Sequence, residues 1–320
     1  MRFKVVILLV VLSGLFPVNG FTQDNPIYEI LENSNPTSRD VVSKKPIGNY
    51  EYVITYKYSI DMNAFDPGKG YKPVYDYMKL ELGENISRYY SISADIRDSI
   101  MYRSRIANPN KAVDLRGWME NGRIAIYDDY YKFGSKRNQQ LVRMGIWDTE
   151  YEYSENLPNF NWSIHTDTLR IICGYKCIAA ETEFRGRRYV VWFSIDLPFN
   201  DGPWKFHGLP GLILAAYESN GIFSWEAVGI SLSHGAIHIY DPEFNNYGRN
   251  VPLMKIRKIS KQEAGKLIRR KWSDPYGFLL ESGTKVSISR ITNDGIQDIT
   301  INASNREKFA LPEIPSLEIE

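Results

Sequence analysis

Apolar and polar residues alternate along most of the chain after residue 49. In residues 50–60, aromatic or β-branched residues alternate with polar ones, a period-two pattern that predicts a strand. Similar short segments recur between turn-forming residues down the chain. The expected strands are residues 50–60, 77–82, 86–93, 123–127, 140–144, 149–153, 161–172, 175–184, 187–197, 211–218, 222–232, 285–291 and 297–301.

Two segments have helical spacing instead. Residues 94–107 carry isoleucines near a helical period and follow Ser93, a candidate N-cap. Residues 260–272 begin with Ser260 and have Glu263 three positions later, which is the pattern of a capping box. Many strands joined by short turns, with two or more helices set apart, predict an α+β domain that is mainly antiparallel β.

The sharpest predicted hairpin turns at Arg185-Gly186. A two-residue loop is the favoured hairpin connection, and it places the opposite charges of Glu183 and Arg188 in cross-strand register. The second arm, residues 189–193, is apolar on both faces. That composition predicts a central strand that is covered on both sides.

The first twenty residues have the pattern of a secretory signal peptide. Arg2 and Lys4 precede an apolar run at residues 5–12, and cleavage is expected before Phe21. No later segment is apolar for the roughly 18 residues that a spanning helix needs. We therefore expect residues 1–20 to be removed and the mature chain to be soluble, with no transmembrane segment.

The mature chain is expected to have two parts. Residues 21–48 are polar and interrupted by prolines, which predicts an extended N-terminal arm with at most a short paired segment. Residues 49–320 then form a single β-rich domain. The chain carries 39 Lys and Arg against 38 Asp and Glu, and the signal removes two of the basic residues. This near-neutral balance gives no electrostatic reason to expect a nucleic-acid partner.

Residues 202–214, GPWKFHGLPGLIL, concentrate glycine and proline before an apolar run. A dinucleotide loop needs GxGxxG between a strand and a helix, whereas the segment that follows here has the pattern of a strand. A rigid connector is favoured, because Pro203 and Pro210 fix φ while Gly208 and Gly211 allow positive φ or close backbone approach. A loop that forms a binding surface is the alternative.

The two cysteines, Cys173 and Cys177, do not supply the four ligands of a structural zinc site. On one continuous strand they would lie roughly 13 Å apart, and a disulfide needs Cα atoms within about 7 Å. A disulfide therefore requires Gly174 to break the strand. A disulfide and two free buried thiols both stay open.

No catalytic constellation stands out. The chain lacks the HExxH and GxSxG patterns, and no SxxK or paired-carboxylate signature stands out. Asp128 and Asp129 are interpreted as a strand-end turn, with a calcium site as the weaker alternative. The four histidines, interpreted as ordinary polar or half-buried residues, are His165, His207, His234 and His238. We therefore assign no catalytic, cofactor-binding or metal-binding residue and expect no cofactor.

Several short elements, taken in order, resemble the GLPGLI family of secreted proteins of Gram-negative bacteria. The elements are ICGYKC at residues 172–177, FRGR at 184–187, GPWKF at 202–206 and GLPGLI at 208–213. The motif residues, for which the sequence predicts structural roles, are Gly174, Tyr175, Cys177, Arg185, Gly186, Arg187, Trp192, Pro198, Gly202, Pro203, Gly208, Leu209, Pro210, Gly211, Leu212 and Ile213. Cys173 departs from the family pattern, which has one cysteine here.

This resemblance implies an exported, β-rich protein, and the family has no established biochemical function. The cysteine, hairpin and aromatic-strand arrangement also resembles periplasmic lipoprotein carriers of the LolA type. That second likeness concerns fold only, and it implies a curved sheet or half-barrel around helices.

The expected function is that of a non-enzymatic binding or carrier module in the cell envelope. It would reside in the periplasm or at the outer membrane and take a peptide, a lipid-like ligand or a protein partner. A hydrolase with scattered catalytic residues and a scaffold for an outer-membrane assembly are the alternatives. The sequence leaves the oligomeric state open.

Overall fold

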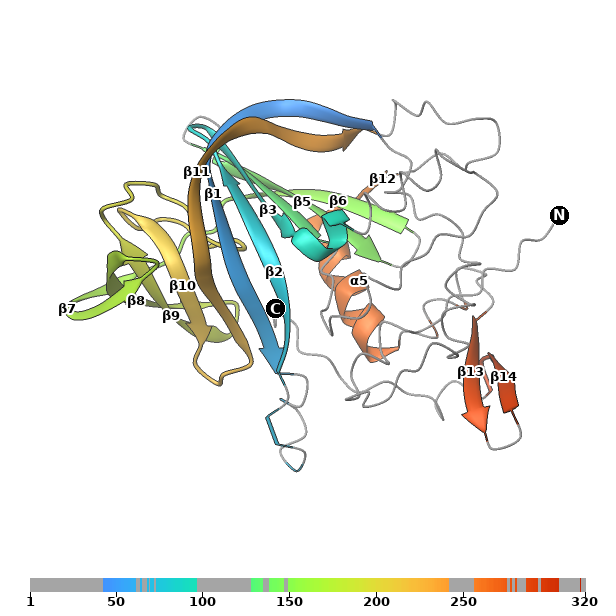
Figure 1. The fold of residues 1–320 in the computed structure, drawn as a ribbon. Helices are drawn as coiled ribbons and strands as arrows, with labels where there is room; N and C mark the ends of the chain where they lie inside the picture. The colour runs from blue at the N-terminus through green and yellow to red at the C-terminus, as the bar shows by residue number, and fades with distance from the viewer. Residues whose placement is uncertain are drawn as a thin grey trace.

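One large sheet dominates the structure, a computed structural model (Figure 1). The structure describes residues 43–61, 64, 68, 70–71, 73–96, 128–134, 138–146, 149–241, 256–274, 277, 280, 286–292, 295–304 and 317. Twelve strands follow the order β12-β6-β5-β4-β3-β2-β1-β11-β10-β9-β8-β7, and β13 and β14 form a separate hairpin. Within the large sheet every neighbouring pair is antiparallel except β12 and β6.

The strand bounds agree with most of the predicted segments. The strands are β1 (Ser43–Asp61), β2 (Pro73–Leu82), β3 (Ile86–Ser91), β4 (Asp128–Phe133), β5 (Gln139–Ile146), β6 (Thr149–Asn156), β7 (Ser163–Ile172), β8 (Tyr175–Phe184), β9 (Arg187–Ser194), β10 (Leu212–Glu218), β11 (Phe223–Asp241), β12 (Ile256–Lys258), β13 (Val286–Thr292) and β14 (Gly295–Ile301). The mainly antiparallel fold class is confirmed. The finer likeness to LolA-type carriers stays a prediction.

The sheet curves because its longest strands bend. Strands β1 and β11 pair along 19 residues each, and their register shifts at three places, between Pro46 and Gly48, Tyr50 and Tyr52, and Thr55 and Tyr56. Such irregularities bend a strand and increase its twist. Figure 1 shows both strands bending together over one end of the sheet.

Contacts between strands far apart in the sheet order define an inner face. Arg185, at the turn between β8 and β9, reaches Glu155 on β6. Tyr56 of β1 donates to the Ile213 carbonyl on β10 at 2.7 Å. The face that carries Tyr56 and Trp225 is the buried one, and we call it the inner face.

The β8–β9 hairpin turns at the predicted residues. Arg185 and Gly186 have φ of 46° and 72°, as a two-residue type I′ turn requires, and Glu183 lies opposite Arg188. The predicted cross-strand register of Glu183 and Arg188 is confirmed, and Arg188 makes its close ion pair with Glu181, two residues along the strand. The prediction that β9 is covered on both faces is wrong, since Trp192 is only half-buried on its outer side.

Strand β4 corrects the interpretation of Asp128 and Asp129 as a turn. Both residues belong to the strand, and Arg88 of β3 donates to the Asp129 carboxylate at 2.7 Å. The local pattern does not predict this strand, because the Asp129 charge is satisfied by Arg88 on the neighbouring strand and Lys132 by the loop at residues 201–206. The strand expected at residues 123–127 lies outside the described residues.

Helix α5 (Lys261–Ser273) begins with the predicted capping box. The Glu263 amide donates to the Ser260 hydroxyl at 3.2 Å, and the Ser260 amide donates to the Glu263 carboxylate at 2.8 Å. Ala264 is buried against the core. Of the other predicted helix, the structure describes helical residues only up to 96.

The N-terminal boundaries are only partly described. Strand β1 already begins at Ser43, inside the expected arm at residues 21–48, so the end of that arm is the anticipated paired segment. The expected signal at residues 1–20 lies outside the described residues, and the division into arm and domain stays a prediction. In the part of the chain that the structure describes, no helix has the length and apolar character to cross a membrane.

Candidate functional site

The family motif lies in a loop that packs on the inner face of the sheet. This motif loop, residues 195–211, joins β9 to β10, and its Trp204 and Phe206 are fully buried. Trp204 stacks on Trp225 of β11 with ring centroids 6.0 Å apart and planes 11° apart. Phe206 meets the same Trp225 ring edge-on at 5.5 Å. The aromatic side chains of the motif loop therefore form part of the hydrophobic core.

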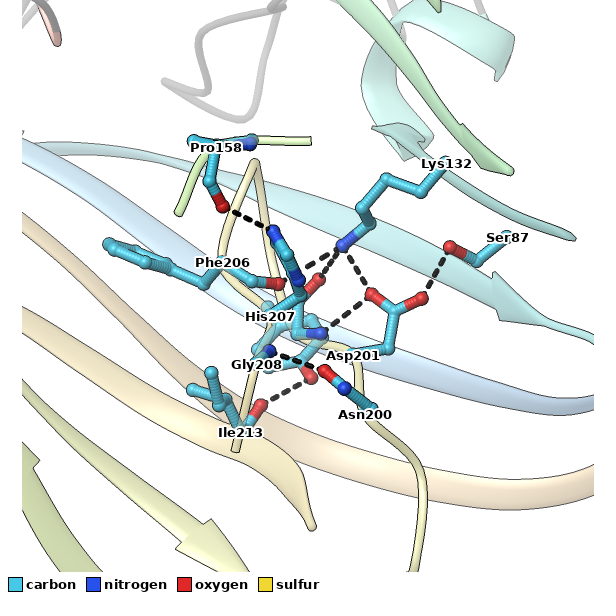
Figure 2. A network of polar contacts seen from close by, with 11 residues as sticks. Ser87, Lys132, Pro158, Asn200, Asp201, Phe206, His207, Gly208 and Ile213 are labelled. Atoms are coloured by element: carbon cyan, nitrogen blue, oxygen red, sulfur yellow. Dashed lines mark hydrogen bonds and ion pairs between the residues drawn. The ribbon is translucent and has the colours of Figure 1, made fainter. Parts of the chain in front are cut away.

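Polar contacts also fix this loop to β3 and β4, which are far from β9 and β10 in the strand order (Figure 2). Lys132 of β4 donates to the Gly202 carbonyl at 2.6 Å and to the Phe206 carbonyl at 3.3 Å, and it pairs with the Asp201 carboxylate. The Ser87 hydroxyl on β3 donates to Asp201 at 2.5 Å. One lysine thus satisfies two loop carbonyls and one carboxylate that the fold has buried.

His207 belongs to the same network. Its Nε2 lies 2.7 Å from the Pro158 carbonyl, and Trp162 Nε1 donates to the His207 carbonyl at 2.9 Å (Figure 2 shows the first contact). Burial, followed by the positive charge of Lys132, lowers the pKa of His207. The imidazole is therefore neutral at pH 7, with its proton on Nε2 and donated to the carbonyl.

This arrangement contains residue types that hydrolases use, but their contacts are those of a structural network. A nucleophilic serine needs a base to accept its proton. The Ser87 hydroxyl is buried and donates to Asp201 instead, while His207 Nε2 faces a carbonyl. Burial lowers the pKa of Lys132, and Asp201 opposes that shift. The network can hold the loop, and its geometry favours no acyl-transfer chemistry.

Lys132→Met is expected to lower the free energy of unfolding by about 2 kcal/mol. The variant keeps the stem but removes the ammonium, which leaves two buried carbonyls without this donor. Asp201 retains the Ser87 hydroxyl and the Gly202 amide, 2.6 Å away, which limits the loss. Urea denaturation measures the effect. Lys258→Met is the control, because that side chain is almost fully exposed and the loss of its charge should change stability little. Equal free energies of unfolding for the two variants would contradict the role of Lys132.

A second ionic cluster connects the motif to β6 and α5. The Glu155 carboxylate contacts Lys205 at 2.5 Å, Arg185 at 2.7 Å and Lys261 at 3.0 Å. Burial alone would raise the pKa of Glu155, but Lys205 and Arg185 outweigh it and lower the value to about 2. Burial lowers the pKa of Lys205, and Glu155 opposes that shift. Lys205 and Arg185, both from motif elements, thus share one ionised carboxylate.

Arg187, the second arginine of FRGR, has a different partner. Its guanidinium lies 3.7 Å from the Glu218 carboxylate and over the Phe223 ring. Glu218 also accepts from the backbone amides of Asn220 and Ile222, at 3.0 and 3.2 Å, in the turn between β10 and β11. The arginine therefore stabilises a hairpin that begins directly after the motif.

The glycines of the motif have two distinct roles. Gly208 has φ of +97°, a conformation that other residues adopt only with strain. Gly211 has no positive φ, but its Cα approaches the backbone of Ser194 so closely that a side chain has no room. Gly174 and Gly186 hold the two hairpin turns with φ of 84° and 72°.

The remaining motif residues differ in burial, and their structural role stays a prediction. Tyr175 is half-buried at the start of β8, and Trp192 is half-buried on β9. Pro198 and Pro210 are the exposed prolines of the loop. The buried members are Cys177, Leu209, Leu212 and Ile213, together with Gly202, Pro203 and Gly211.

Both cysteines are free thiols. Cys173 and Gly174 form the two-residue turn between β7 and β8, so Gly174 does break the strand as a disulfide would require. Cys173 is nevertheless exposed with its thiol toward the Ala227 carbonyl at 3.2 Å, and Cys177 is buried. Burial raises the pKa of the Cys177 thiol to about 11, which disfavours the reactive thiolate.

Thiol titration of the denatured, reductant-free protein should therefore find two free thiols per chain. In the folded protein, Cys173 should react and Cys177 should be protected, because only Cys173 is exposed. Ellman's reagent measures both states. Two thiols that appear only after reduction would show that the protein carries a disulfide.

An apolar surface lies at the open end of the sheet. Leu169 and Ile171 on β7 are 51% and 75% exposed, and Ile195, directly after β9, is 56% exposed. Leu169 lies opposite Ile178, which lies opposite the buried Phe193, so this row of side chains shares the inner face. We call Leu169, Ile171 and Ile195 the apolar edge.

Residues 179–215 match a family model. The family is described as proteins of unknown function, Porph_ging, an uncharacterised family found in Bacteroidetes. The match covers the FRGR hairpin, the motif loop and the start of β10. The contacts of Lys132 and of Glu155 described above involve residues of this hairpin and this loop. The more specific GLPGLI assignment stays a resemblance.

Comparisons outside that family add little. No curated protein matches the chain. Two solved structures of PNGF-II, in the P21 and C2 space groups, align with 16% identity and a TM-score of 0.44. They cover 77% of this chain, and the chain spans 36% and 35% of their lengths. A likeness at this level describes a distant β-rich protein and supports no functional argument.

The sequence did not identify the strand residues that hold the motif loop. Ser87 and Glu155 come from β3 and β6, which alternation predicted, whereas Lys132 comes from β4, which it did not. Lys205 lies inside the segment GPWKFHGLPGLIL and Asp201 directly precedes it, so a charged residue beside glycines and aromatics was the available signal. Their partners could not be named without the fold.

Proposed function

We propose that this chain is an exported, non-enzymatic envelope module that binds a protein partner on the apolar edge. The observation that carries the proposal is the exposure of Leu169 and Ile171 on the face whose central residues form the core, with Ile195 also exposed directly after β9. Exposed apolar side chains that are grouped in this way typically mark interaction surfaces. The basic and apolar N-terminal pattern supports export.

Protein binding fits the structure better than transport of a lipid-like ligand. A carrier needs an apolar surface that a ligand can reach. The inner-face aromatics that could have formed one, among them Trp204, Phe206 and Trp225, are instead packed against each other. The hydrolase alternative gains no support from the described residues, because the Ser87, Asp201 and His207 contacts hold the loop.

Co-purification from native envelopes tests this function. Wild type, the double variant Leu169→Ser/Ile171→Ser and the control Leu232→Ser should be compared by mass spectrometry. Leu232 is 67% exposed but lies on β11, away from β7 in the sheet order. We expect one dominant partner with wild type and with the control, and its loss with the double variant. A partner that all three retain, or no partner with wild type, would contradict binding at the apolar edge.

A further inference from the structure

We propose that β7 takes an extended segment of the partner protein as an added strand, along Leu169–Ile171. This inference rests on the proposed function and specifies how the apolar edge would bind. Strand β7 is the last strand of the described sheet, with β8 as its only strand neighbour there. The pairing register, the exposed side chains and the charge of Arg170 together define the partner.

The register identifies the backbone groups that are available. Cys173 and Gly174 form a two-residue turn, so Ile172 and Tyr175 beside it form a hydrogen-bonded pair. Such pairs alternate along antiparallel strands, which makes Arg170 opposite Cys177 the next one. The N–H and C=O groups of Leu169 and Ile171 therefore point away from β8, toward the open edge.

The same two residues carry the exposed apolar side chains. Leu169 and Ile171 are two positions apart, so both side chains lie on the inner face. A strand added here would gain backbone hydrogen bonds and apolar contacts from the same residues, which is the usual basis of binding by strand addition. The pairing between β7 and β8 is interrupted between His165 and Leu169, so the regular edge begins at Leu169. The added segment is therefore short.

Arg170 sets the preferred charge of that segment. Its side chain lies on the outer face, where it donates to the Tyr217 hydroxyl at 2.6 Å and to the Glu226 carboxylate at 2.8 Å, and it remains partly exposed. A residue directly across from it on an added strand should be acidic. The partner segment therefore has two apolar residues separated by an acidic one.

A second copy of this chain fits the edge poorly. A two-fold antiparallel pairing that uses Leu169 and Ile171 of both copies places Arg170 directly opposite Arg170. Like charges in this position destabilise a strand pair. A different protein with the apolar–acidic–apolar pattern avoids that conflict.

A synthetic peptide tests the binding mode on the full mature chain. The probe is a fluorescein-labelled Thr-Val-Glu-Val-Thr peptide, and its controls are the same peptide with N-methylated valines and a version with lysine in place of glutamate. We expect anisotropy titrations to show at least about tenfold weaker binding of the N-methylated peptide, because it cannot complete the strand hydrogen bonds. The lysine peptide should bind several-fold more weakly than the glutamate peptide.

Amide hydrogen exchange separates this inference from the proposed function. Strand addition should slow exchange of the Leu169 and Ile171 amides by at least about tenfold on saturation with the glutamate peptide, with Arg170 unaffected. Binding without that protection, equal binding of the N-methylated peptide, or no binding of the glutamate peptide would overturn strand addition. Dimerisation of the free chain with protection of the same amides would also overturn it, in favour of self-association. In each case the envelope experiment still decides whether the apolar edge binds a partner.

Discussion

Gly211→Val should lower the free energy of unfolding by more than about 4 kcal/mol, enough to prevent stable folding in many domains of this size. The first side-chain carbon at this position would lie 2.6 Å from the Ser194 carbonyl carbon and 3.0 Å from the Ile195 nitrogen. Both are backbone atoms at the end of β9, and β9 is the strand with which β10 pairs. Relief of the overlap requires the motif loop to move away from the sheet, which would disturb the packing of Trp204 and Phe206.

Thermal and urea unfolding of purified variants measure this loss. Gly229→Ala is the matched control, because an added carbon there meets no atom within 4 Å and the backbone has no positive φ. Gly208→Val should be intermediate, at about 1–3 kcal/mol, since its strain comes from φ of +97° and a contact 3.2 Å from Trp162 Nε1. A Gly211→Val protein that unfolds like Gly229→Ala would show that the close approach to Ser194 is not part of the fold.

Glu155→Gln should cost about 3–5 kcal/mol, the range for removing one partner of a buried ion pair. The substitution keeps the shape of the side chain and removes the charge that Lys205, Arg185 and Lys261 share. Lys205 and Arg185 are buried, so water replaces the lost interaction poorly. Glu181→Gln is the control, because its partner Arg188 is largely exposed and such pairs contribute less than about 1 kcal/mol.

The stability difference between wild type and Glu155→Gln should depend on pH. The pKa of Glu155 is lowered from 4.5 to about 2 in the folded chain, so the folded state favours the ionised carboxylate. That contribution is fully present above pH 4.5 and is lost as the pH falls toward 2. Urea titrations at pH 7, 4 and 3 should show the difference between the two proteins shrinking. A constant difference across this range would contradict the assigned charge state.

Local patterns predicted most of the strands but failed where charged residues are buried. Tyr50 to Ile60 and the Arg185-Gly186 hairpin follow period-two alternation and turn chemistry, and both form as expected. Strand β4 was missed because Asp128 and Asp129 look like a turn until Arg88 is placed beside them. The register of Glu183 and Arg188 follows from the turn, but a long side chain also reaches a diagonal neighbour, and Arg188 makes its close ion pair with Glu181.

The apolar edge was also hidden in the sequence. Leu169 and Ile171 belong to a segment that was correctly predicted as a strand, but neither residue was singled out. Whether an apolar strand residue packs or binds depends on its position in the sheet order. The sequence does not contain that order, because it arises from pairing between distant segments.

The sequence by itself determined the antiparallel strands, the Arg185-Gly186 turn and the capping box of α5. These features depend on residues within a few positions of one another, where backbone sterics and periodicity decide the outcome. Only the tertiary structure decided which residues contact the motif loop. Lys132 and Ser87 meet Asp201, and Glu155 meets Lys205, across more than 40 residues of chain, because the curved sheet brings distant strands onto one loop. Pairing between distant strands sets the strand order, which buries Trp204 and Phe206 of the motif loop and leaves β7 at the edge of the described sheet.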